Sequence, residues 1–417
     1  MKIAKQVVVL ILVFASWSFA GTIAITNVKI YPVSGPMIEN GTIVIVDHKI
    51  AAMGADVTIP QDAKVLDLAG KSVFPGFIDA NCHVGLNEIS LVTATVDSTE
   101  SVDPVTPQMR VTDGFFPESF AIAVTRSNGV TAGVVSPDDV NVFAGMSALI
   151  EFSGERLDQV VLQPLAAFHM TLGEAPKDTY GEADKMPGTR MGTAALVRQI
   201  FTQAREYGEK WKRYEEKKTG KSKDVESKPP DVDLKLQAVL DALNGNVPVV
   251  VSAHRVDDIL TAVRIADEFG FKKNLVINHG TNAYKIADLL AREKIPVLVG
   301  PVTTQPDRME TLGALYENAA LLHKAGVMIA IQSNETHNAR NLPYEAALAV
   351  ANGLPYEEAL KAITLNVARI FRLDQQLGSL EIGKRANLIV AEGDPLDPRT
   401  RITHVFIGGS EIKELLP

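Results

Sequence analysis

The sequence predicts an α/β protein: a (β/α)8 barrel of the TIM type, with a small composite β-sandwich formed by the two ends of the chain. Two observations lead to this fold class. Through the middle of the chain, short apolar runs alternate with amphipathic helical patterns, which is typical of parallel β/α units. Near both ends, short β-branched runs are separated by turns. With 417 residues, 46% hydrophobic and 22% charged, the chain is long enough to bury a core in each part.

The first twenty residues have the pattern of a Sec-type signal peptide. Lys2 and Lys5 form a short basic region, Val7–Ala15 is apolar, and Ser18–Ala20 offers a cleavage site. The apolar run is shorter than the ~18 residues that a membrane-spanning helix needs. We therefore expect an exported protein, periplasmic or extracellular, that begins at Gly21 and has no membrane span. An uncleaved N-terminal anchor is the alternative.

Short strand patterns occur near both ends of the chain. The candidate strands near the N-terminus are Ile23–Ile25, Val28–Ile30, Gly41–Val46, Ile50–Ala52 and Val65–Asp67, and those near the C-terminus are Ala386–Val390 and Thr403–Ile407. Neither end is long enough to bury a sheet face alone. We therefore expect residues 21–70 and 372–417 to pair into one sandwich, with residues 71–371 forming the barrel between them.

The middle of the chain contains eight candidate barrel strands. They are Phe74–Asp79, Thr131–Val135, Ala148–Phe152, Pro164–Met170, Val247–Ser252, Leu275–Asn278, Pro296–Val299 and Val327–Ile331. Helical patterns separate most of them, for example Asp257–Phe269, Ala283–Glu293 and Met309–Ala325. Eight strands favour a closed parallel barrel over an open sheet.

Composition excludes several classes of function. The net charge of −9 argues against a nucleic-acid surface. The single cysteine, Cys82, excludes a disulfide framework and any cysteine-built zinc or iron–sulfur site, and a buried thiol facing the helices is its expected state. Residues 205–228 carry charges of both signs with interleaved aromatics. A solvated helical extension is favoured there over a surface for nucleic acid or an acidic partner.

Four histidines stand at the ends of predicted strands: His83, His169, His254 and His279. The carboxyl ends of barrel strands converge on one mouth, where active sites are built. Neutral imidazoles that converge in this way are natural ligands for zinc or a similar ion. The alternative is that these histidines are polar residues of the core whose ring nitrogens are hydrogen-bonded within the protein. The sequence has no His-Glu-x-x-His, G-x-S-x-G, P-loop or G-x-G-x-x-G motif.

Several segments resemble motifs of the amidohydrolase superfamily. Pro75–His83 resembles its first-strand motif PGFID-x-H-x-H, and Val251–His254 and Ile277–Thr281 resemble its fifth and sixth strands. The tail motif G-S-[IL]-x-x-G-K-x-A-D-L is similar to Gly378–Leu388, and Gly393–Leu396 follows it. Asn338–Glu345 is similar to the exported, imidazolonepropionase-like branch. The resemblance covers almost the whole chain after residue 20.

This resemblance implies a metal-dependent hydrolase acting on C–N bonds other than peptide bonds, often in cyclic amides or small dipeptide-like molecules. The family holds one or two divalent ions through two first-strand histidines, a fourth-strand lysine or glutamate, histidines on strands five and six, and an eighth-strand aspartate. That aspartate also takes the proton from the attacking water. The metal lowers the pKa of water and polarises the scissile carbonyl.

The chain departs from this pattern at three of the positions. Asn81 replaces the first histidine, His169 stands at the fourth-strand position, and Asn334 replaces the eighth-strand aspartate. An amide is a poor zinc ligand and cannot act as a general base near neutral pH. Because the inherited positions carry no negative charge, we expect at most one divalent ion. It would be zinc, bound by His254 and His279 with help from His83 or His169.

The remaining candidate residues follow the eighth strand. Beside Asn334, Glu335 or His337 is the candidate proton acceptor in place of the missing aspartate, with ordinary loop residues as the alternative. Arg340 could hold a substrate carboxylate through its forked donors, although a structural ion pair is favoured over this role. Asn81 is a candidate substrate contact. Asp79 is expected to bond within the turn of the first strand.

The resulting hypothesis is an exported hydrolase that cleaves a C–N bond of a small molecule with a metal-activated water. The replacements at Asn81 and Asn334 motivate an alternative, a catalytically impaired relative that binds a ligand or pairs with an intact homologue. A homo-oligomer is compatible with either. A third class, a solute-binding module for transport, is disfavoured because the sequence lacks a two-lobed pattern.

Overall fold

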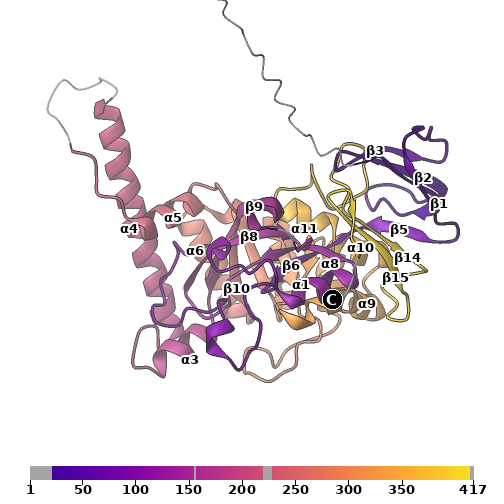
Figure 1. The fold of residues 1–417 in the computed structure, drawn as a ribbon. Helices are drawn as coiled ribbons and strands as arrows, with labels where there is room; N and C mark the ends of the chain where they lie inside the picture. Colours follow the sequence, from indigo (N-terminus) through magenta and orange to yellow (C-terminus); the bar gives the residue numbers. More distant parts are fainter. Residues whose placement is uncertain (1–20, 155, 219–227, 414–417) are drawn as a thin grey trace, which may run out of the picture.

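The computed structural model describes residues 21–154, 156–218 and 228–413. The expected signal peptide lies outside the described residues, so export stays a prediction. Within the described ranges, no helix is both long enough and apolar enough to cross a membrane. The chain forms two sheets: in Figure 1 the larger one lies in the centre with helices packed around it, and the smaller one lies to its right.

The smaller sheet combines strands from both ends of the chain, as predicted. Its order is β16-β15-β14-β5-β1-β2-β3, and β4 pairs with β1 in parallel. The strands are β1 (Ile23–Ile30), β2 (Ile38–Val46), β3 (Lys49–Gly54), β4 (Lys64–Asp67), β5 (Ser72–Pro75), β14 (Leu388–Ala391), β15 (Ile402–Ile407) and β16 (Ser410–Glu411). Apolar side chains from both ends, such as Ile25, Ile43, Leu388 and Phe406, share one core. Burying this face jointly is what holds the two ends together.

The larger sheet has eight strands and is a nearly closed barrel. They are β6 (Phe77–Cys82), β7 (Val130–Val135), β8 (Phe143–Glu151), β9 (Val161–Thr171), β10 (Val249–Ala253), β11 (Leu275–His279), β12 (Val297–Val299) and β13 (Ile329–Ile331). Each predicted barrel strand overlaps one of them. The seam between β13 and β6 is closed just beyond β13, where the Asn334 amide donates to the Asn81 carbonyl at 2.9 Å. The carbonyl of Glu335 accepts from the His83 amide at 3.0 Å.

Three details differ from the sequence-based expectation. The strand β8 runs antiparallel to both neighbours, because the connections on either side of it are too short for the crossover that parallel strands need. The predicted strand Phe74–Asp79 is split at Gly76, where β5 ends in the smaller sheet and β6 enters the barrel. A Cβ at Gly76 would lie 2.2 Å from the Thr131 hydroxyl oxygen, so only glycine fits there. The helix expected over Met309–Ala325 is confined to α8 (Asn318–Lys324).

Helices cover the outside of the barrel. They are α1 (Phe120–Ser127), α2 (Leu157–Val160), α3 (Ala175–Gly181), α4 (Arg190–Glu216), α5 (Leu234–Leu243), α6 (Val256–Glu268), α7 (Ala287–Glu293), α8, α9 (Leu342–Ala351), α10 (Tyr356–Ala362) and α11 (Leu365–Ile370). Inside the barrel, small and branched apolar residues such as Ala80, Val134 and Leu298 form a core together with Phe371, which follows α11. The barrel interior is therefore a packed core.

The charged segment begins on the long helix α4, which extends beyond the barrel beside α5 (Figure 1). Tyr207 is buried, and Trp211 packs edge-to-face between it and Tyr214. The expected helical extension is thus present as far as Glu216, and residues 219–227 lie outside the described part of the chain. Cys82 is fully buried in the core between barrel and helices, as expected.

Candidate functional site

The four strand-end histidines lie at the same end of the barrel. His83 and His254 directly follow β6 and β10, while His169 and His279 lie at the ends of β9 and β11. A cavity of about 430 Å³, called here the mouth cavity, opens at this end. Its lining includes Asp139, Ser252, His254, His279, Arg308 and Glu310. His254 and His279 thus line the mouth cavity, whereas His83 and His169 lie at the same end of the barrel but are not part of its lining.

A carboxylate that the sequence analysis missed lies among these histidines. Asp139 belongs to the connection between β7 and β8, and its Oδ2 is 2.7 Å from His279 Nε2. Its other oxygen accepts a hydrogen bond from the Ser252 hydroxyl. Burial by itself would raise the pKa of Asp139, but the charge and hydrogen bond of His279 hold it well below its usual range. Asp139 is therefore an anion at neutral pH.

His279 is the charged partner of this carboxylate. Its Nδ1 lies 2.9 Å from the Gly300 carbonyl, which can only accept a hydrogen bond. The carboxylate accepts from Nε2, so both ring nitrogens carry a proton. Burial opposes this charge, but Asp139 raises the pKa of His279 above its ordinary value. The backbone of His279 is in the left-handed region, with φ at 65°, a strained conformation that is common at functional sites.

His83 and His169 each have an unused ring nitrogen. The Nε2 atoms of both are buried and make no hydrogen bond within the part of the chain that the structure describes. The His83 Nδ1 lies 2.9 Å from the Ser136 carbonyl, which can only accept a hydrogen bond, so it is the other nitrogen, Nε2, that lacks a partner. Burial lowers the pKa of His169 to about 4, so the His169 ring is neutral. A buried nitrogen without a partner costs free energy, and these two are therefore available to a ligand.

His254 is neutral and stacks on His279. The ring centroids are 4.4 Å apart with an interplanar angle of 17°. Its Nδ1 is 2.8 Å from the Thr281 hydroxyl, and its Nε2 is 3.8 Å from the buried carboxylate of Glu310. Burial, assisted by the charge of His279, lowers the pKa of His254 to about 3. Burial also raises the pKa of Glu310, so this pair can hold a proton between them.

The two asparagines at inherited ligand positions bond to each other. Asn81 Nδ2 donates to Asn334 Oδ1 at 2.8 Å, and Asn81 Oδ1 accepts from the Ser136 hydroxyl at 2.6 Å. Asn334 also has a left-handed backbone, with φ at 53°. An amide–amide contact thus stands where the family has an imidazole and a carboxylate.

The other predicted residues are spread around the mouth. Glu335 lines the mouth cavity, whereas His337 and Arg340 lie outside its lining, on the turn η6 (His337–Asn341). His337 Nε2 lies 2.9 Å from the Glu88 carbonyl. Arg340 is exposed, and its backbone carbonyl accepts from Asn128 at 3.0 Å. The structure therefore does not bring His337 or Arg340 into the cavity.

Asp79 holds the segment after β13 against β6. Its Oδ1 accepts from the Asn81 amide at 3.2 Å, as expected for the first-strand turn, and also from the Ser333 amide at 3.0 Å. The Ser333 hydroxyl donates to the other oxygen. Burial raises the pKa of Asp79 to about 7 even though these bonds oppose the shift. Asp79 thus positions Asn334 and Glu335 without lining the mouth cavity.

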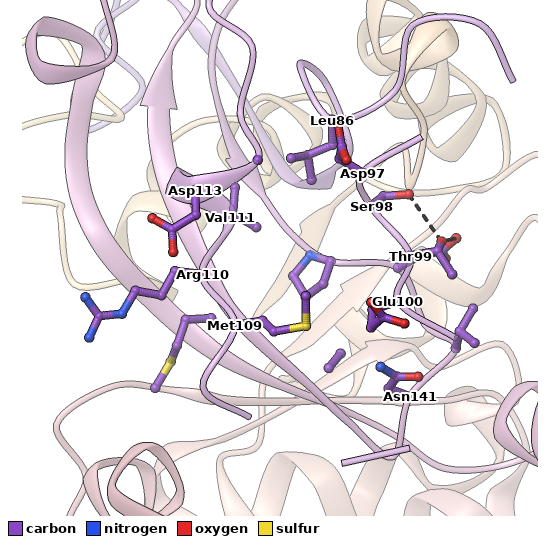
Figure 2. Close-up of a pocket in the computed structure, with 16 residues that line it drawn as sticks. Leu86, Asp97, Ser98, Thr99, Glu100, Met109, Arg110, Val111, Asp113 and Asn141 are labelled. Atoms are coloured by element: carbon purple, nitrogen blue, oxygen red, sulfur yellow. Dashed lines mark hydrogen bonds between the residues drawn. The ribbon is translucent and has the colours of Figure 1, made fainter. Parts of the chain in front are cut away.

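A second cavity, of about 260 Å³, lies on the other side of the segment that carries Asp139. Figure 2 shows Asp113, Arg110 and Met109 on one side of it and Ser98 and Thr99 on the other. Asp138 and Val140 line both cavities. The Asp138 carboxylate accepts from the Thr99 hydroxyl at 3.0 Å, and its amide donates to the Ser98 carbonyl at 2.9 Å. These two hydrogen bonds hold Asp138 in place and thereby fix the backbone position of the neighbouring Asp139.

Comparisons with known proteins agree with this architecture. The sequence model of the Amidohydrolase family matches residues 250–412. The crystal structure of an amidohydrolase from Thermotoga maritima MSB8 shares 36% sequence identity and superposes with a TM-score of 0.87, covering 94% of this chain and 100% of that one. The chain belongs to the amidohydrolase family.

Other proteins that resemble this chain have lower sequence identity to it. The amidohydrolase tasK of Hapsidospora irregularis is 27% identical over 391 residues, which are 90% of this chain and 39% of the relative. The curated relatives matched are longer proteins, of which the chain spans 39% to 53%. A zinc-bound adenosine deaminase from Xanthomonas campestris is 16% identical, with a TM-score of 0.54 over 95% of this chain and 94% of that one, and shares the fold.

Amidohydrolases generally use a divalent metal ion, which needs several side-chain donors close together at the barrel mouth. Among the described residues, no three His, Cys, Asp or Glu side chains are grouped closely enough to hold an ion as they stand. The donor chemistry nevertheless fits a single ion. Two buried imidazole nitrogens have no partner, and a third imidazole lies against an anionic carboxylate.

Proposed function

We propose that this amidohydrolase cleaves a C–N bond other than a peptide bond in a small molecule, with Asp139 as the acidic residue that the inherited positions lack. The observation that carries the proposal is the contact between Asp139 and His279 in the mouth cavity. It supplies one negative charge at the end of the barrel where this family performs its chemistry. The cavity volume of about 430 Å³ suits a small substrate.

One divalent ion, zinc by the chemistry of the donors, would be held by His83, His169 and His279 together with Asp139, with His254 as a further imidazole. When bound, such an ion lowers the pKa of water and polarises the carbonyl of the scissile bond. His279 Nε2 could serve as a ligand only after giving up the proton that it shares with Asp139, so metal binding would release a proton from this pair.

The chain's own groups then account for the proton transfers. Asp139, kept ionised by its surroundings, accepts a proton from the attacking water, and the Ser252 hydroxyl orients it through the other oxygen. The leaving nitrogen needs a proton when the C–N bond breaks. That proton is the one that Asp139 has taken from the water, and His254, which lines the same cavity beside Glu310, would relay it to the leaving nitrogen. A proton acceptor in position contributes on the order of 10²–10⁴-fold in rate.

The test is hydrolysis by purified, zinc-loaded protein. Release of amine or ammonia would be measured on a panel of cyclic amides, N-acyl amino acids, dipeptides and aminopurines, with protein stripped by chelator as the control. We expect turnover of at least one compound that depends on zinc. Absence of turnover across the panel, combined with tight binding of a panel compound, would support the impaired relative instead.

We predict that the protein binds one zinc ion per chain. Several carboxylates line the mouth cavity, but Asp139 is the one that is hydrogen-bonded to a strand-end histidine among the described residues, so we expect these donors to hold a single ion. Metal analysis of protein purified without chelators checks this stoichiometry. A value near two ions per chain would show that the ligand set is larger than these residues.

We also propose that the protein acts outside the cytoplasm, on the basis of the basic start and apolar run of residues 1–20. The expected mature chain begins at Gly21. The intact mass of protein recovered from the periplasm or the medium measures this directly, and a mass that still includes residues 1–20 would contradict it.

A further inference from the structure

Resting on the proposed function, we propose that the substrate carries a carboxylate group and that Arg308 binds it at the rim of the mouth cavity. Arg308 would thereby determine specificity for anionic over neutral C–N substrates. Its role is to hold the substrate, separate from the proton transfers assigned to Asp139 and His254.

The first observation is that Arg308 has a free guanidinium. It lines the mouth cavity and is exposed, and it makes no side-chain hydrogen bond or ion pair with any residue that the structure describes. Other arginines near the surface are ion-paired, for example Arg198 with Glu268 at 2.8 Å and Arg399 with Asp397 at 2.6 Å. A guanidinium forms its strongest interactions with planar carboxylates, through two parallel hydrogen bonds.

The second observation is that the backbone carrying Arg308 is anchored. Its amide donates to the Thr311 hydroxyl at 3.0 Å, and that hydroxyl donates to Asp307 at 3.1 Å. Two residues away, the buried Glu310 carboxylate accepts from the Glu174 amide at 2.8 Å, which ties this segment to the loop after β9. The backbone of Arg308 is therefore held in place before a ligand binds, so that less conformational entropy is lost on binding.

The third observation concerns charge. Arg308 is the sole lysine or arginine in the described lining of the mouth cavity, beside several carboxylates that include Asp138, Asp307 and Glu335. A single guanidinium among acids favours a singly charged carboxylate over a phosphate, because the doubly charged group would be repelled by the acids. Apolar residues such as Leu172 and Pro301 complete the lining and suit an apolar substituent.

Arg308 also lies close to the groups that would carry the chemistry. Arg308, His254 and Asp139 all line the mouth cavity. A carboxylate held by Arg308 would therefore be anchored beside His254, with the C–N bond of the same molecule directed toward Asp139. Arg340, the arginine that the sequence suggested for this role, lies outside the cavity lining.

The experiment measures binding and turnover separately, on zinc-loaded protein. The probes are N-acetyl-L-leucine and N-acetyl-L-proline, each paired with its primary amide, which keeps the same acyl C–N bond but removes the charge. Calorimetry gives affinity, and amine release gives KM and kcat. The variants are Arg308→Gln and Arg308→Lys, with Arg401→Gln as the control because Arg401 is an exposed arginine outside the mouth cavity.

We expect the parent to bind the acids more tightly than the amides, and Arg308→Gln to weaken acid binding by roughly tenfold to a hundredfold without changing amide binding. Any increase in KM should exceed the change in kcat. Arg308→Lys should recover part of the affinity, because lysine restores the positive charge but lacks the two parallel N–H donors of a guanidinium. Equal binding of acids and amides by the parent, or no loss in Arg308→Gln, would overturn the proposal. Zinc-dependent turnover of neutral compounds alone would overturn it while leaving the proposed function intact.

Discussion

Replacing Asp139 by Asn should lower the rate of C–N hydrolysis by about 10²–10⁴-fold, the usual contribution of a positioned proton acceptor. An amide keeps the size of the side chain and can still contact Ser252 and His279, but it cannot accept a proton near neutral pH. The measurement is kcat on the best compound of the panel, with thermal unfolding to confirm that the variant is folded. Zinc content should fall as well, since the substitution removes the anionic donor.

The neighbouring carboxylate provides the matched control. Asp138 also lines the mouth cavity, but its carboxylate is hydrogen-bonded to Thr99 and not to a histidine. Asp138→Asn should therefore change the rate by less than tenfold, although it removes the same charge one residue away. Equal losses in the two variants would indicate that Asp139 acts only through the electrostatic field or the fold. An unchanged rate in Asp139→Asn would remove it from the mechanism.

The second large effect is expected from restoring the inherited residues. The double variant Asn81→His, Asn334→Asp should bind zinc more tightly than the parent and gain C–N hydrolase activity, on the order of 10²–10⁴-fold if the new carboxylate acts as a base. The structure supports this design because the two side chains already lie 2.8 Å apart at the mouth of the barrel. Asn334→Asp conserves the volume of the side chain, whereas Asn81→His enlarges a buried one, so thermal unfolding must confirm that the variant is folded. Competition with a chelator measures affinity, and the substrate panel measures activity.

The single variants separate the two contributions. Asn81→His adds a metal donor without a base, so it should raise zinc affinity more than rate. A double variant that binds no more zinc than the parent would show that these positions do not correspond to the family's ligands. A parent that is already active and a slower double variant would show that the asparagines belong to a different working mechanism, built around Asp139.

Local patterns were sufficient to locate the barrel strands and the histidines at their ends. Alternation of apolar runs with amphipathic patterns depends on short stretches of chain, and parallel strands that close into a barrel place their carboxyl ends together. His83, His169, His254 and His279 were found in this way. The direction of β8 was missed because the prediction counted strands without weighing the lengths of the connections around it.

The signal for Asp139 was present but weak. Pro137, Asp138 and Asp139 directly follow the second barrel strand, at the end where the histidines gather. Carboxylates in such a connection are ordinary surface residues in most cases. Only the contacts of Asp138 with Ser98 and Thr99 turn the segment so that Asp139 meets His279. Those partners are separated from the segment by some forty residues of sequence.

The sequence by itself thus determined the fold class, the sheet shared by the two chain ends, the family and the histidines at the barrel mouth. All of these follow from the order of residues along single elements and from the geometry of a closed barrel. The tertiary structure alone decided that Asp139 pairs with His279, that Asn81 bonds to Asn334, and that Arg308 rather than Arg340 reaches the cavity. These are properties of loops, whose paths are set by contacts between residues far apart in sequence and therefore have no local signature.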